Sequence, residues 1–545
     1  MLSKKNPNCQ LKMPKSSLYS SSFMPKIGLC LLILSLYIGL FHSIHYPLFD
    51  VDEGAFSEAS REMLVSGDFI SPRLDQAPRF DKPILIYWLQ SASLALFGIN
   101  EFAARLPAAL ATCGWALLVW AFLFRVGHAS KGPVAALILT TCMEISVLGK
   151  AATADTLLNL FLCAALFSWY LYLRHSSRKY LYLAFLFMSL GFLTKGPVAV
   201  VLPAGITFLY TLSSQQSIPL RTWLRAWLNP IGLLIFLLIA MPWYIAEYQR
   251  DGFDFVVGFF FKHNLGRFSQ AMETHSGPWW YYLPVILIGL LPYSTALFST
   301  LKDYRHYWNN DLFRFLIIWF LFVFLLFSIS STKLPHYIVY GYTPLFILIA
   351  STLSRCGRGS STERLSNHMP ALPAWVFIPA FASFIVLAFL PAILDHYLQQ
   401  AKPQVLQAYG ELPGLFTNGY VIVQSIFAGL VLFFSLNRKM RQVYGLIIIA
   451  IMQSWSLNHY ILPAVSTIQQ SPIKQAALLA RQNGWDVHVW RIQSPSFSFY
   501  RQRPSLHTPP TAGNIVLTRQ QHLLDFKNYN LLFIQHGIAL IQLKS

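Results

Sequence analysis

The stretch Asp50-Val51-Asp52-Glu53-Gly54 opens a polar segment, residues 47–105, between the first two apolar runs of the chain. Eight acidic residues fall between Asp50 and Asp81, close to basic groups at Arg61, Arg73, Arg79 and Lys82. The rest of the chain is mostly apolar, so this concentration of charge stands out. We interpret residues 47–105 as a candidate catalytic loop.

The composition is that of a membrane protein. Of 545 residues, 55% are hydrophobic and 12% are charged, and the mean hydropathy is positive, which excludes a soluble multidomain enzyme. The net charge of +19 comes from short Lys and Arg clusters between apolar runs. The positive-inside rule accounts for such clusters as cytoplasmic loops, so the charge does not favour nucleic-acid binding. The six cysteines imply no disulfide framework.

The apolar runs predict a polytopic, mainly α-helical protein. Residues 1–26 carry five lysines and form an expected cytoplasmic tail, and Ile27–Phe41 follows without a small-residue cleavage site, as in an uncleaved signal anchor. A span needs about 20 apolar residues. We expect thirteen, at residues 27–46, 104–124, 132–148, 155–173, 180–194, 197–212, 228–246, 279–299, 313–329, 336–353, 372–393, 419–436 and 443–463. Alternating sides from a cytoplasmic start places every basic loop inside.

The candidate catalytic loop then lies on the outer face. Within it, Glu53–Val65 has helical spacing and Ile84–Phe97 is apolar but too short to span, so both are expected to be helices at the membrane interface. Residues 27–463 form the predicted transmembrane domain and residues 464–545 a small outer α/β domain. That domain should contain a helix at Ile473–Gln482, strands at Val487–Ile492 and Ile515–Thr518, and a pair of strands around Gly537 within Leu531–Leu543.

The acidic pair Asp52-Glu53 follows the first span at the start of an expected helix. A carboxylate there is stabilised by the helix dipole, so a capping role explains one acid. It does not explain two adjacent acids beside a membrane with basic groups nearby. The context therefore favours a site.

Further charges fall on outer turns. Asp81-Lys82-Pro83 is either a site or a surface ion pair worth at most about 1 kcal/mol. Each lysine at a span end can also snorkel to the headgroups, and Glu144, inside an expected span, can pair with a neighbouring helix. The outer-turn set comprises Lys150, Asp155, Lys195 and Lys333, and the long outer loop adds Arg267 and His275.

No Gly-rich nucleotide loop, Walker motif or HExxH pair is present. Cations can stabilise a leaving phosphate, acids can activate an acceptor, and an apolar groove can take a lipid tail. The combination predicts group transfer from a lipid-linked phosphate on the outer face.

The residues also resemble a known family. The chain is similar to bacterial relatives of the dolichyl-phosphate-mannose protein mannosyltransferases, most of all the aminoarabinose transferases that decorate lipid A. The resemblance covers residues 27 to about 350. Its motifs are Asp52-Glu53, Lys82-Pro83, Phe97-Gly98, Arg105-Leu106-Pro107, Ala154-Asp155, Thr194-Lys195-Gly196, Pro242-Trp243-Tyr244, Arg267-Phe268, His275 with Pro278, and Lys333-Leu334-Pro335-His336-Tyr337.

This resemblance implies a GT-C membrane glycosyltransferase of the bacterial inner membrane. It would use a polyprenyl-phosphate sugar donor on the periplasmic face and act on lipid A or another envelope glycolipid. By analogy Asp52 is the catalytic acidic residue, with Glu53, Lys82 and Asp155 in the catalytic group. Lys195, Lys333, Tyr337 and Arg267 would bind the donor phosphate, and Asp81 with His275 would share a divalent metal.

Three departures affect what the resemblance implies about substrates. Ala55-Phe56 replaces the usual Arg-Tyr, Asp81 replaces Glu, and Arg79 replaces Tyr. The sugar and the acceptor therefore do not follow. Protein O-mannosyl transfer stays open as an alternative, whereas a lipid or solute transporter is disfavoured because no paired halves are seen.

Overall fold

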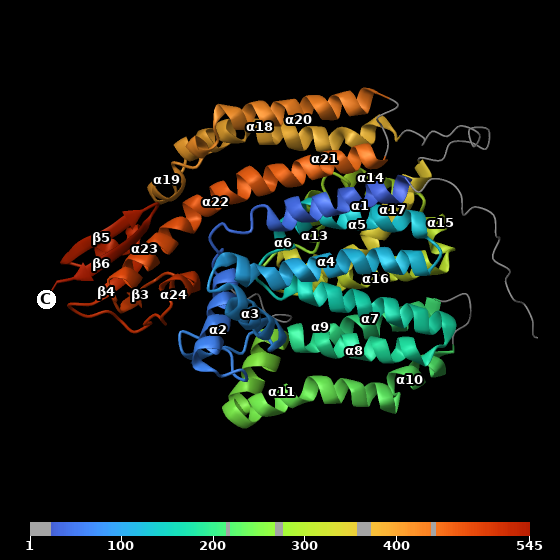
Figure 1. Ribbon diagram of the computed structural model, residues 1–545, viewed down its shortest axis with the longest axis horizontal. Helices are drawn as coiled ribbons and strands as arrows, with labels where there is room; N and C mark the ends of the chain where they lie inside the picture. Colours follow the sequence, from blue (N-terminus) through green and yellow to red (C-terminus); the bar gives the residue numbers. More distant parts are fainter. Residues whose placement is uncertain (1–22, 214–218, 267–275, 357–371, 438–442, 545) are drawn as a thin grey trace, which may run out of the picture.

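The computed structural model describes residues 23–213, 219–266, 276–356, 372–437 and 443–544. Figure 1 shows long helices running side by side, with a small domain that contains a sheet at one end of the bundle, next to α2. The candidate catalytic loop therefore lies between the bundle and the C-terminal domain.

Within residues 23–213 and 219–266 the regular elements are helices, apart from one short hairpin. Its elements are α1 (Phe23–Leu36), α2 (Asp52–Ser66), β1 (Arg73–Leu74), β2 (Ala77–Pro78), α3 (Leu85–Phe97), α4 (Glu101–Arg125), α5 (Gly132–Thr141), α6 (Met143–Leu148), α7 (Asp155–His175), α8 (Arg178–Lys195), α9 (Val198–Ser213), α10 (Leu220–Trp227), α11 (Pro230–Val256) and η3 (Val257–Gly266).

The second half continues the bundle and ends in the sheet. Its elements are α13 (Tyr282–Gly289), α14 (Ser294–Lys302), α15 (Tyr304–Trp308), α16 (Asp311–Ile329), η4 (Pro335–Gly341), α17 (Tyr342–Cys356), α18 (Ile378–Gln399), α19 (Pro403–Tyr409), α20 (Asn418–Leu436), α21 (Val443–Ser456), α22 (Leu462–Gln469), α23 (Ser471–Gln482), β3 (Val487–Val489), α24 (Pro495–Arg501), β4 (Ile515–Arg519), β5 (Tyr529–Gln535) and β6 (Ile538–Leu543).

Eight helices within the described ranges are long and apolar enough to cross a membrane, or nine if the pair α13 and α14, bent by 114°, is one span. All eight overlap segments that the sequence predicts as spans. Shorter apolar helices occupy Ile27–Phe41, Leu85–Phe97 and Val198–Ser213. The protein is thus a multi-pass, mainly α membrane protein, and the count of thirteen spans stays a prediction.

The main core packs α4, α5, α7, α16 and α17 together around buried tryptophans. Trp115 Nε1 donates to Thr343 Oγ1 at 2.9 Å, and Trp319 Nε1 donates to the carbonyl of Tyr340 at 2.8 Å. Buried indoles need such partners. The second contact fixes the backbone of η4, which carries part of the site described below.

The two helices expected in the candidate catalytic loop (residues 47–105, called the opening loop below) are confirmed as α2 and α3. α2 ends at Gly67, whose φ of +71° is the left-handed conformation that glycine adopts without strain. Ser60 Oγ donates to Gln90 Oε1 at 2.9 Å, and Gln90 Nε2 donates to the carbonyl of Ala104 at 3.0 Å. α2, α3 and α4 are therefore tied together; their placement at a membrane interface stays a prediction.

The C-terminal α/β domain is also confirmed. Its sheet has the order β3-β4-β6-β5, with β3 parallel to β4 and the other pairs antiparallel. β5 and β6 meet at a two-residue turn, His536-Gly537, where both φ values are positive, as the favoured hairpin turns require.

α24 docks this domain on the opening loop. Three contacts join them: Ser496 donates to Asp50 from its amide (2.9 Å) and hydroxyl (2.6 Å), the amide of Leu48 donates to Tyr500 OH (2.7 Å), and Ser498 Oγ donates to Asp75 Oδ1 (2.7 Å). Burial raises the pKa of Asp50 to about 7, against the effect of its bonds to Ser496.

Candidate functional site

The two adjacent acids at the start of α2 have different surroundings. Successive helix positions differ by about 100° around the axis. Asp52 is exposed, whereas Glu53 is buried. The pair that the sequence presents as one feature is therefore two separate groups.

Glu53 is held in a buried ion pair with Arg105. Its Oε1 accepts from Arg105 Nε and the amide of Ala152, both at 2.8 Å, and its Oε2 accepts from Arg105 Nη2 (2.6 Å) and the amide of Phe49 (2.9 Å). Burial alone would raise the pKa of Glu53, but the charge and hydrogen bonds of Arg105, together with the amides of Phe49 and Ala152, outweigh burial and lower it. Because both oxygens are occupied, we propose that Glu53 positions the loop rather than reacting.

Asp52 faces a cavity of about 210 Å³, which Thr153, Asp155 and His336 also line. Within the described part of the chain, the Asp52 carboxylate accepts no hydrogen bond. A free, exposed carboxylate in a concave site can accept a proton from a substrate group. Asp52, which is expected to be the catalytic acidic residue, therefore lies in the same cavity as Asp155.

Asp155, the first residue of α7, binds Lys195 at the last residue of α8. Its Oδ1 accepts from Lys195 Nζ at 2.5 Å and from Tyr340 OH at 2.6 Å. The rings of Tyr337 and Tyr340 lie 5.4 and 5.3 Å from Lys195 Nζ. Tyr337 and Tyr340 are three residues apart in the 3₁₀ helix η4, a spacing that puts them on one side. The structure therefore brings together Asp155, Lys195 and Tyr337, which the sequence predicts for one site.

His336 lies beside Asp155 and lines the same cavity. Its Nε2 is 3.9 Å from Asp155 Oδ1, and the charges of Asp155, Lys195, Asp52 and Lys82 all act on it. Lys82, although it comes from the opening loop, is therefore near enough for its charge to act on His336.

Basic side chains lie beside both carboxylate oxygens of Asp81. Lys82 Nζ lies 2.9 Å and His263 Nδ1 3.4 Å from Oδ1, while Arg79 Nη2 lies 3.2 Å from Oδ2. A carboxylate neutralised by lysine and arginine does not fit a resident divalent metal without losing those pairs. The expected metal partner, His275, lies outside the described residues, and the histidine beside Asp81 is His263.

The remaining predicted site residues lie as follows. Lys333 is buried, its Nζ donates to the carbonyl of Ser330 at 2.6 Å, and its chain passes beside Gly277. The structure thus gives Lys333 a backbone contact instead of a place on the Asp155–Lys195 pair. Arg267 lies outside the described residues.

From the sequence alone we expect no role for His336, Tyr340 or Arg79. The segment from Lys333 to Tyr340 contains His336 and two tyrosines, and this cluster of polar side chains in an apolar region is a sequence signal for a site. Arg79 donates to Tyr87 OH at 3.0 Å, and its guanidinium lies 5.4 Å from the centre of the Phe56 ring. A cation therefore lies over Phe56, at one of the positions where the chain departs from the family pattern.

Comparisons with known proteins identify the family of this chain. The family described as dolichyl-phosphate-mannose-protein mannosyltransferase matches residues 81–245. An undecaprenyl phosphate-alpha-4-amino-4-deoxy-L-arabinose arabinosyl transferase of Erwinia tasmaniensis is 31% identical over 389 residues, covering 68% of this chain and 68% of its own length. Its counterpart in Edwardsiella ictaluri is 35% identical over 316 residues, covering 56% of each chain.

The fold also matches a solved structure. ArnT from Cupriavidus metallidurans, solved bound to undecaprenyl phosphate, has a TM-score of 0.77 at 19% identity, covering 95% of this chain and 97% of that one. At this identity the match shows the GT-C fold, as expected from the sequence.

Proposed function

Because this chain belongs to the family of the bacterial undecaprenyl phosphate-aminoarabinose arabinosyl transferases, we propose that it is a glycosyltransferase that moves a pentose from a polyprenyl-phosphate carrier to an acceptor. The observation that carries the proposal is the cavity shared by Asp52, Asp155 and His336, with Lys195 bound to Asp155. It holds one free acid and two nearby lysines, the groups that transfer from a lipid phosphate needs.

In the proposed reaction, an acceptor oxygen forms a bond to the anomeric carbon of the sugar, and the bond from that carbon to the carrier phosphate breaks. The electron pair stays on the departing carrier phosphate. If the acceptor is a hydroxyl, its proton passes to the Asp52 carboxylate. If the acceptor is itself a phosphate, it is already ionised and Asp52 orients the attack.

Lys82 and Lys195 stabilise the negative charge that grows on the departing phosphate. Lys195 is preorganised for this role because Asp155 and Tyr340 fix its ammonium from two sides. Fixed charges cost little reorganisation at the moment of reaction. Asp155 is accordingly a positioning residue for Lys195, and no step requires a metal at Asp81.

For the acceptor we propose lipid A or another envelope glycolipid. The family match to protein mannosyltransferases over residues 81–245 favours a protein hydroxyl as the second candidate. Membership in a transferase family removes the support for a transporter.

We further propose that the protein lies in the bacterial inner membrane with this cavity on the periplasmic side. The basic loops would then be cytoplasmic, as the positive-inside rule requires. In this arrangement residues 1–26 are a cytoplasmic tail, residues 27–463 the catalytic membrane domain and residues 464–545 a periplasmic domain.

The proposal is tested by mass spectrometry of lipid A and envelope glycans from a strain that lacks the gene. We expect one pentose-modified species to disappear and to return with the wild-type protein but not with Asp52→Asn. Asp254→Asn, an exposed acid on α11, is the matched control and should restore the species. Restoration by Asp52→Asn at the wild-type level would overturn the assignment.

A further inference from the structure

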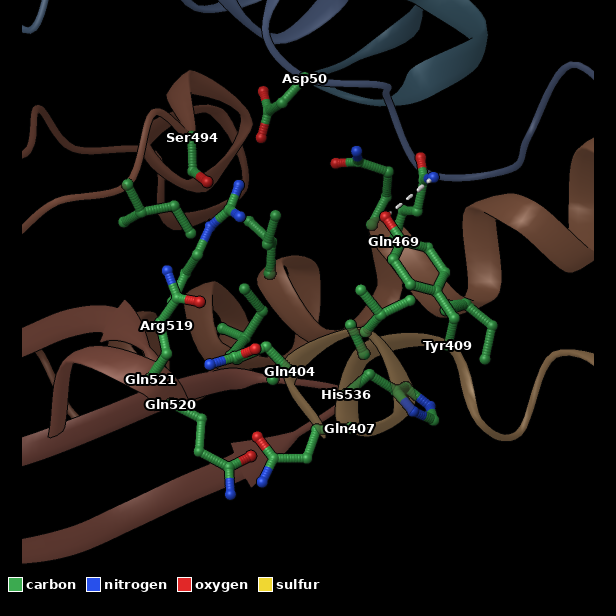
Figure 2. A pocket seen from close by; sticks show the side chains of 18 of the residues that line it. Asp50, Gln404, Gln407, Tyr409, Gln469, Ser494, Arg519, Gln520, Gln521 and His536 are labelled. Carbon is green, nitrogen blue, oxygen red and sulfur yellow. Dashed lines mark hydrogen bonds between the residues drawn. The ribbon is translucent and has the colours of Figure 1, made fainter. Parts of the chain in front are cut away.

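A second and larger cavity, of about 410 Å³, lies where the C-terminal domain meets the membrane domain. Figure 2 shows side chains from several separate segments pointing into it. These segments are α19, the junction of α22 and α23, the connection from β3 to α24, the end of β4 and the β5–β6 turn. A volume of about 300–1,000 Å³ is usual for small-molecule sites.

The lining of this cavity is rich in amides. Seven of its twenty residues are glutamines. Gln404 and Gln407 are three residues apart on α19 and share one face. Each glutamine offers two N–H donors and a carbonyl acceptor without carrying charge. Such groups match a ligand with many hydroxyls, because one amide can pair with two neighbouring hydroxyls.

A cation and an aromatic ring complete the cavity. Arg519, at the end of β4, has no ion-pair partner among the residues with described positions, and Figure 2 shows it reaching toward Ser494. Guanidinium groups bind phosphate or carboxylate through two parallel hydrogen bonds. Tyr409 contributes a ring whose hydroxyl accepts from Gln469 at 3.4 Å.

The two cavities share a wall. Asp50 and Val51 line both, and the next residue, Asp52, lines only the smaller one. Ser496 holds Asp50 in place through two hydrogen bonds. A molecule seated among the glutamines is therefore separated from the Asp52 cavity by two residues.

We propose that this cavity is the subsite for the acceptor, and that it takes a saccharide headgroup carrying one anionic substituent, which Arg519 binds. The inference rests on the proposed glycosyl transfer. The glutamines bind the hydroxyls of the headgroup, the ring of Tyr409 packs against its apolar face, and the reacting oxygen extends past Val51 toward Asp52.

The test uses the full-length protein in detergent and the deacylated lipid A disaccharide bisphosphate as a soluble probe. Binding is measured by calorimetry for the wild type, Arg519→Gln and the double variant Gln404→Leu with Gln407→Leu. Arg481→Gln and Gln482→Leu are matched controls, because both residues are exposed at the end of α23 outside the cavity. Undecaprenyl phosphate binding is measured in parallel, as a readout that a local fold defect would also change.

We expect the probe to bind the wild type and both controls equally. Arg519→Gln should weaken binding at least about tenfold, the effect of one charge-assisted hydrogen bond. The unphosphorylated disaccharide should bind Arg519→Gln and the wild type alike, and inorganic phosphate at equal concentration should not displace the bisphosphate. In turnover assays, Arg519→Gln should show a raised KM for the acceptor, while its kcat and its KM for the donor stay unchanged.

Equal probe affinity in wild type and Arg519→Gln would overturn the subsite, as would displacement by inorganic phosphate alone. The proposed function is refuted by a different result, namely turnover by Asp52→Asn at the wild-type level. If Asp52→Asn is inactive while Arg519→Gln keeps its acceptor KM, the transferase assignment stands and the subsite is refuted.

Discussion

The neighbours Asp52 and Glu53 should give opposite results when each is replaced by its amide. In Glu53→Gln one oxygen keeps its two donors, but the new NH₂ group faces two further donors, Arg105 Nη2 and the amide of Phe49. Arg105 is fully buried and loses its counter-charge. Breaking a buried pair from one side costs about 3–5 kcal/mol. Asp52→Asn removes no hydrogen bond to a described residue and should leave stability unchanged.

The assay compares thermal unfolding of the purified variants with their turnover at a temperature where both are folded. Glu53→Gln should unfold at a clearly lower temperature. Asp52→Asn should unfold with the wild type but turn over about 10²–10⁴-fold more slowly, the usual contribution of a general base. Equal unfolding temperatures for Glu53→Gln and wild type, or an unstable Asp52→Asn, would refute this division of roles.

Three further results are expected. Lys82→Met should lower kcat by about 10²–10³-fold, as loss of one donor to a developing anion does, and weaker donor binding at unchanged kcat would contradict that role. Asp75 and His507 form a pair at 2.7 Å between the β1–β2 hairpin and the C-terminal domain. The hydrogen bond to Asp75 raises the pKa of His507. Burial alone would raise the pKa of Asp75, but its hydrogen bonds, including the one to His507, lower it. The stability contributed by the raised pKa of His507 is fully present below about pH 6.5 and is lost as the pH rises through that raised pKa. The stability contributed by the lowered pKa of Asp75 is present above about pH 4 and is lost as the pH falls through that lowered pKa. Amide exchange in α24, corrected for intrinsic rates, should therefore increase from pH 6 to pH 9 in the wild type and change less in His507→Gln, and identical profiles would show that the pair is irrelevant. Chelator treatment should leave activity intact because Asp81 is already paired, and a loss reversed by one divalent cation would disprove this.

The fold followed from the sequence where the signal is periodic or compositional. Eight of the expected spans, together with α2, α3 and the C-terminal strands, each carry a hydropathy pattern that is visible without tertiary information. The site followed in part: Asp155, Lys195 and Tyr337 are polar residues on apolar turns, and the structure joins them.

The rest depended on contacts that no pattern records. The difference between Asp52 and Glu53 arises because Arg105, fifty-two residues later, reaches back to only one of them. His336 and Tyr340 gain their place because η4 meets the ends of α7 and α8. The cavity lined by the glutamines is formed by several separate segments, none of which carries a distinctive motif, so no single segment predicts it.

The docking of α24 on the opening loop determines how this protein could be recombined with its relatives. Asp50 and Asp75 are bound by Ser496 and Ser498, so a C-terminal domain from another family member would meet a loop shaped for a different partner. A chimera designed to exchange acceptors should carry residues 48–78 together with residues 464–545. These two segments should therefore be exchanged together, because they are distant in the sequence but in contact in the structure.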